Sequence, residues 1–171
     1  MAGKKQGGFT LLELSVVLII VGLVTTVGVS SGISAIESAK RSQTESKLSV
    51  IEAALMTFRM NNNRLPCPAN LVLVKGNTNY GNETNTPGMC SGSNFGSAGG
   101  VVEGGVPTRA LNIPGDFMYD GWGRKIAYAV DSNMTQFDAF GAISIPESCG
   151  ITVNDAARTA RTTSAAYVLV S

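Results

Sequence analysis

The 171-residue sequence predicts an α+β protein, in which one long N-terminal helix packs on a small antiparallel sheet with long loops. Three observations predict this class. An uncharged apolar run lies near the N-terminus, a helical stripe of apolar residues follows it before the first proline, and short alternating strand patterns occur only towards the C-terminus. We expect the chain to divide into residues 1–8, 9–36, 37–62 and 63–171.

The apolar run contains 23 consecutive uncharged residues, from 14 to 36. At about 1.5 Å of rise per residue, such a helix covers ~34 Å, which is enough to cross the hydrocarbon core of a bilayer. Lys4 and Lys5 precede it, so the positive-inside rule places the N-terminus in the cytoplasm and the residues after the run outside. A secretory signal peptide or a plain membrane anchor would also explain the run, but neither explains Glu13 at its edge.

The helix is predicted to continue beyond the run, from about residue 9 to about residue 60. The apolar stripe of its second half has spacings of three and four residues and comprises Leu48, Ile51, Leu55 and Phe58. We expect this half, residues 37–62, to pack on the globular head. The asparagines at 61–63 and Pro66 are predicted to end the helix.

The head, residues 63–171, combines long polar loops with a few strand patterns. Long surface loops with short strands at most are expected over 76–85 and 88–105, where Asn, Gly, Ser and Thr predominate. Strands are expected at 125–130, 142–145 and 165–170, with a weaker candidate at 151–153. Trp122 is interpreted as an anchor of the core.

Several function classes are disfavoured by composition. The formal net charge of +1 gives no basic surface for nucleic acid, and the absence of histidine excludes Ser-His-Asp and Cys-His catalysis. Asp116 and Asp120 could form a carboxylate pair, but Asp beside Gly is usually a turn former. The glycine-rich stretch 99–105 lacks the Gly-Lys-Ser/Thr ending of a phosphate-binding loop. We therefore expect no enzyme activity, no metal and no cofactor.

The three cysteines are Cys67, Cys90 and Cys149. They lack the close spacing of a zinc or redox motif, so outside the cytoplasm one disulfide and one remaining thiol are possible. Cys67 and Cys90 flank the loop-rich stretch, where a crosslink would reduce chain entropy most, and this pair is weakly favoured. The other pairings stay open.

One motif identifies a family. The segment Gly8-Phe9-Thr10-Leu11-Leu12-Glu13 resembles the signal sequence of type IV prepilins and type II secretion pseudopilins. The resemblance implies a pilin-like fold, removal of residues 1–8 as a leader by a membrane prepilin peptidase that cuts between Gly8 and Phe9, and N-methylation of Phe9. It also implies that Glu13 is the carboxylate that family members use in assembly.

A physical argument accompanies this role of Glu13. After cleavage, the positive amine of Phe9 and the carboxylate of Glu13 lie four residues apart, ~6 Å along a helix. When such helices stack with an axial offset, the carboxylate of one can meet the amine of a neighbour, which offsets two costly buried charges. Glu13 is therefore predicted to set the register of assembly.

Two weaker resemblances favour the secretion branch of the family. Residues 58–66 resemble the asparagine-rich helix exit of the major pseudopilin, and Asp120-Gly121-Trp122-Gly123 resembles its turn into a strand. Two departures oppose this assignment: Ser30 stands where many members have proline, and we find no acidic calcium-binding loop near the C-terminus.

The sequence is therefore interpreted as a structural subunit, a pseudopilin or minor pilin, of a type II secretion pseudopilus or type IV pilus. The expected partners are the prepilin peptidase, other pilin or pseudopilin subunits, the inner-membrane assembly platform and the inner membrane. The expected location is the bacterial inner membrane, single-pass, with a periplasmic head. The alternative is a membrane-anchored periplasmic binding protein that uses a pilin-like signal.

Overall fold

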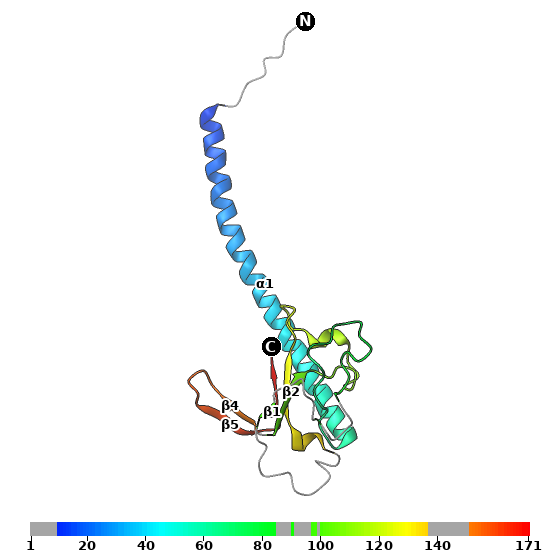
Figure 1. Ribbon diagram of the computed structural model, residues 1–171. Helices are drawn as coiled ribbons and strands as arrows, with labels where there is room; N and C mark the ends of the chain where they lie inside the picture. Colours follow the sequence, from blue (N-terminus) through cyan, green and yellow to red (C-terminus); the bar gives the residue numbers. More distant parts are fainter. Residues whose placement is uncertain (1–9, 85–89, 91–96, 99, 137–150) are drawn as a thin grey trace. The chain divides into compact units, whose positions relative to one another are not determined.

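The computed structural model describes residues 10–84, 90, 97–98, 100–136 and 151–171. It contains two compact units, Met1–Ala39 and Lys40–Ser171, which are described separately. Figure 1 shows one long helix, α1, followed by a region of strands and loops. The structure is therefore α+β, as the sequence predicts.

Helix α1 runs from Leu11 to Asn62, close to the predicted bounds. In the first unit its large apolar side chains, where they are described, are exposed, from 47% for Val16 to 90% for Leu11. Exposed apolar surface of this extent is typical of a segment that binds a membrane or another protein. Among the described residues, no helix meets the length and apolarity that a membrane crossing requires.

The end of α1 confirms the predicted stop signal. Asn63 adopts a left-handed conformation with φ of 51°, and its N–H donates to the carbonyl of Arg59 at 2.9 Å. Asparagine tolerates this conformation better than most residues, and the bond satisfies a carbonyl of the last turn. The chain therefore leaves the helix immediately after the asparagine run begins.

The second unit contains a four-stranded antiparallel sheet in the order β1-β2-β3-β6. Its strands are β1 (Ser97–Ala98), β2 (Val101–Gly105), β3 (Ala127–Asp131) and β6 (Tyr167–Val170). A separate antiparallel pair consists of β4 (Ile151–Asn154) and β5 (Ala160–Ala165). Two short 3₁₀ helices are η1 (Gly115–Met118) and η2 (Ser132–Thr135). Figure 1 shows β4 and β5, in orange, projecting from the rest of the head.

The core lies between the second half of α1 and one face of the sheet. Ile51 and Leu55 are fully buried and belong to one cluster with Val102, Tyr128 and Val130. The alternation along β3 places Tyr128 and Val130 on the same face, towards the helix stripe. The predicted apolar stripe is therefore the surface that joins α1 to the head.

Three expectations for the head concern the stretch 88–105, the candidate strand at 142–145 and Trp122. The stretch 88–105 was expected to be a long loop with short strands at most, and its end forms the five-residue strand β2 inside the sheet. Gly105 exchanges backbone hydrogen bonds of 2.7 and 2.8 Å with Ala69, and an added Cβ would lie 3.2 Å from Leu71 Cδ2. This close approach favours a small residue, and glycine weakens the local signal for a strand. The candidate strand at 142–145 lies outside the described residues. Trp122 is 41% exposed, so its interpretation as a core anchor was wrong.

Candidate functional site at the helix start and in the head

Helix α1 begins with two reciprocal hydrogen bonds between Thr10 and Glu13. The Glu13 N–H donates to Thr10 Oγ1 at 3.3 Å, and the Thr10 N–H donates to Glu13 Oε2 at 3.2 Å. The Thr10 hydroxyl also donates to Glu13 Oε2, at 3.1 Å. This arrangement is a capping box, which satisfies N–H groups that the first helical turn leaves free.

The sequence interpretation missed this local role of Glu13, although the Thr-x-x-Glu pattern before an apolar run signals it. Glu13 therefore caps its own helix, and its pairing with a neighbouring subunit stays a prediction. Its position in the first turn also suits a negative charge, because the helix dipole is positive there. Gly8 and Phe9, the predicted cleavage and methylation residues, lie outside the described residues.

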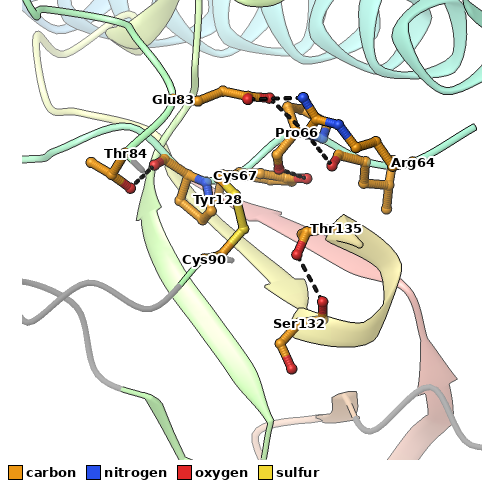
Figure 2. The surroundings of a disulfide bond; sticks show 11 residues. Arg64, Pro66, Cys67, Glu83, Thr84, Cys90, Tyr128, Ser132 and Thr135 are labelled. Carbon is orange, nitrogen blue, oxygen red and sulfur yellow. Dashed lines mark hydrogen bonds and ion pairs between the residues drawn. A yellow bond between two sulfur atoms is a disulfide. The ribbon is translucent and has the colours of Figure 1, made fainter. Parts of the chain in front are cut away.

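The segment that follows α1 contributes one member of a buried ion pair (Figure 2). The Arg64 guanidinium donates to both carboxylate oxygens of Glu83, at 3.1 and 3.0 Å, and to the carbonyl of Leu65 at 3.2 Å. It also lies 5.0 Å from the centre of the Phe58 ring. Both charged side chains are almost fully buried, so each one neutralises the other where water is excluded.

A disulfide joins Cys67 and Cys90, the pair that the sequence weakly favoured. It crosslinks the buried exit segment to the loop-rich part of the head (Figure 2). Beside it, the Tyr128 hydroxyl donates to the carbonyl of Pro66 at 3.1 Å, and burial raises the pKa of Tyr128 well above its usual value. The hydroxyl therefore stays protonated and able to donate. Cys149 lies outside the described residues.

The turn at 120–124 is organised by the carboxylate of Asp120. Oδ1 accepts the N–H groups of Trp122 and Arg124 at 2.8 Å each, and Oδ2 accepts Arg124 Nε at 2.9 Å. Burial acts to raise the pKa of Asp120, but these hydrogen bonds and the guanidinium charge outweigh it, and the pKa lies below its usual value. Asp120 is thus a turn former, while the Asp116 carboxylate pairs with Lys75 at 2.6 Å.

The same turn is attached to the beginning of the helix in the second unit. The Gly121 N–H donates to Thr44 Oγ1 at 2.9 Å, and the Thr44 hydroxyl donates to the carbonyl of Lys40 at 2.8 Å. A Cβ at Gly121 would approach the Cα of Lys40 to 2.9 Å, against backbone atoms that cannot move aside. Glycine is therefore required by the packing of the turn on α1.

We expect an Asp120→Asn substitution to flatten part of the pH dependence of stability. Because its folded pKa is lowered, the ionised carboxylate stabilises the fold above the unfolded pKa of about 3.9, and this contribution is lost as the pH falls through the folded pKa. Urea unfolding at several pH values should therefore show the largest difference between wild type and variant near neutrality. Equal pH profiles for the two proteins would contradict this account.

Two lysines hold backbone carbonyl groups in the head. Lys125 Nζ donates to the carbonyls of Leu71 and Leu73 at 2.5 and 2.7 Å, and Lys47 Nζ donates to that of Tyr119 at 2.7 Å. No group of three or more Cys, Asp or Glu side chains in the described part of the chain is placed to hold a metal ion. The two lysine ammonium groups thus satisfy backbone carbonyls of the head.

Known proteins are similar to this chain in two respects: a short motif around the helix start and a longer alignment to individual proteins. Residues 3–29 match the model of a family described as the prokaryotic N-terminal methylation motif. The chain is 37% identical over 65 residues to type II secretion system core protein G of Pectobacterium carotovorum subsp. carotovorum, which covers 38% of this chain and 42% of that relative. The core protein G of Aeromonas hydrophila is 35% identical, over 39% of this chain and 46% of that relative.

The core protein G of Klebsiella pneumoniae is 36% identical, over 37% of this chain and 45% of that relative. The chain thus matches less than half the length of these relatives. No solved structure gives a significant match. The methylation motif and the similarity to core protein G agree with the resemblance of the segment at 8–13 to the type IV pilins and type II secretion pseudopilins.

Proposed function

We propose that this chain is a structural subunit, a pseudopilin or minor pilin, that is cut between Gly8 and Phe9 by prepilin peptidase and then assembled into a filament. The observation that carries this proposal is the match of residues 3–29 to the methylation motif, at the start of a helix whose described apolar side chains are exposed as far as Ile36. A helix of that kind needs a bilayer or other subunits to cover it.

The relatives named as type II secretion core protein G favour a secretion pseudopilus over a pilus. Before assembly, the uncharged run 14–36 would lie in the inner membrane, with the lysines of the leader in the cytoplasm and the head in the periplasm. Its partners would be prepilin peptidase, other pseudopilin subunits and the inner-membrane assembly platform. Nothing in this role requires the chain to be an enzyme.

Processing is tested by expressing the full chain with and without a prepilin peptidase and determining the N-terminus by mass spectrometry. We expect a mature chain that begins with a methylated Phe9 only when the peptidase is present. An unprocessed N-terminus in both cultures would contradict the proposal. A processed chain that never crosslinks to another subunit would favour the alternative, a membrane-anchored binding protein.

Substitutions of Glu13 separate its capping role from its role in assembly. Gln can still accept the N-cap hydrogen bond but carries no charge, whereas Ala removes both functions. If the Glu13 carboxylate pairs with the amine of a neighbour, both variants strand that amine, and incorporation into filaments should fall by on the order of a hundredfold or more. Crosslinking of subunits in membranes and sheared filaments measures incorporation.

The matched control is Glu37→Gln, which removes another exposed carboxylate from the first unit of α1. This variant should insert and assemble like the wild type. Normal assembly of Glu13→Gln together with failure of Glu13→Ala would show that capping alone matters. That outcome would overturn the pairing role of Glu13 without affecting the proposed processing.

A further inference from the structure

The turn at 120–124 exposes an aromatic ring beside an arginine. Trp122 is the single tryptophan of the sequence, and it remains 41% exposed although Asp120 fixes the backbone around it. The guanidinium carbon of Arg124 lies 5.4 Å from the centre of the Trp122 ring. Tryptophan favours the interface between membrane and water, because its ring is largely apolar while its N–H seeks a polar partner.

The position of this turn along the chain brings it close to the predicted bilayer. Gly121 packs on Lys40, which follows residue 36, the last of the uncharged run, by four residues. Four residues span ~6 Å in a helix and at most about 14 Å in any conformation. The polar layer on each side of the hydrocarbon core is about 5–8 Å deep. With the run in the bilayer, the turn therefore lies within reach of the lipid headgroups.

The charges near the turn suit an anionic lipid surface. Arg41 and Arg124 are exposed, and Lys40 begins this part of the helix. The Asp120 carboxylate is buried and paired with Arg124, so it presents little negative charge to a lipid. Two acidic residues flank this basic group along α1: Glu37 precedes it, and the exposed Glu45 follows Arg41 by one helical turn, farther along the chain from the uncharged run. Basic groups at such a depth attract anionic headgroups.

We propose that the turn at 120–124 docks on the headgroup layer of a bilayer containing anionic lipid, with the Trp122 ring inserted and Arg41 and Arg124 directed at lipid phosphates. The proposal rests on the proposed function, since it needs the chain to be anchored by residues 14–36. The docked turn holds the head against the membrane surface before assembly. Extraction of the subunit into a filament then has to break this contact as well as remove the helix.

Because Trp122 is the single tryptophan, its fluorescence tests the proposal directly in the unmodified chain. The full protein is reconstituted into vesicles of phosphatidylcholine with phosphatidylglycerol, in which the phosphatidylcholine is brominated on the upper part of its acyl chains. We expect the vesicles and protein to float together, the emission to shift to the blue and the bromine atoms to quench it. If the protein floats with the vesicles but the Trp122 emission is neither shifted nor quenched, docking of the turn is overturned and anchoring by the helix is not. If the protein does not float with the vesicles, both docking and anchoring are overturned.

Two variants sharpen the experiment. In Trp122→Phe with Met60→Trp, the reporter moves to an exposed site 20 residues beyond Lys40, about 30 Å along the helix, and quenching should disappear. Arg41→Gln should lower the ratio of docked to free heads by about fivefold in the anionic vesicles and have little effect in phosphatidylcholine alone. Quenching at residue 60 equal to that at residue 122, or equal docking of Arg41→Gln, contradicts the proposed geometry.

Discussion

Replacing Glu83 by Gln should lower the free energy of unfolding by about 3 kcal/mol, because the buried Arg64 loses the carboxylate that offsets its charge. The guanidinium keeps its contacts with Leu65 and the Phe58 ring, so the loss lies at the lower end of the usual range for broken buried pairs. Urea unfolding of the full chain in detergent, followed by circular dichroism, measures the change.

A double variant and an exposed pair serve as controls for this prediction. Arg64→Met combined with Glu83→Gln should recover a large part of the lost stability, since no buried charge then remains. Asp116→Asn breaks the pair with Lys75, whose two side chains are mostly exposed, and should change stability little. Equal losses from Glu83→Gln and Asp116→Asn would contradict the account of a buried pair.

Removing the disulfide with Cys67→Ala and Cys90→Ala should lower the free energy of unfolding by about 3 kcal/mol. The bond closes a loop between residues 23 apart in sequence, and opening it returns conformational freedom to the unfolded chain. Urea unfolding with and without a reductant measures the effect. The wild type should lose stability on reduction, while the variant should be insensitive to the reductant.

Mass spectrometry under non-reducing conditions provides the independent check on this prediction. Peptides containing Cys67 and Cys90 should be recovered as one linked species from protein that has been exported from the cytoplasm. A linkage of either residue to Cys149 would contradict the expected pairing. A wild type that unfolds identically with and without reductant would show that the bond contributes nothing to stability.

Local patterns were sufficient where they act within one element. The apolar stripe at Leu48, Ile51 and Leu55 predicted both the continuation of α1 and the face that packs on the sheet, because helical spacing fixes which side chains share a face. Asn63 marked the helix end through its tolerance of a left-handed conformation. Strands β3 and β6 also lay close to predicted positions, and along β3 buried residues alternate with partly buried ones.

Such local patterns could not predict contacts between segments that are distant in the sequence. Strand β2 is defined by pairing with β3 and by the close approach of Ala69 to Gly105, although glycine disfavours a strand locally. Arg64 and Glu83 meet across 19 residues of sequence, and nothing near either residue signals the other. The exposure of Trp122 likewise depends on where the turn meets α1.

For the candidate site, the sequence by itself contained the methylation motif and the carboxylate at Glu13, since a motif of this kind is a property of a contiguous segment. The capping of Thr10 and Glu13 is also local, since the Thr-x-x-Glu pattern signals it. Only the tertiary structure decided that the turn carrying Trp122 is attached at Lys40, because the packing of that turn depends on the folded backbone. The physical reason is therefore the range of the interactions: those within one helix are encoded locally, whereas those between segments exist only once the head has folded.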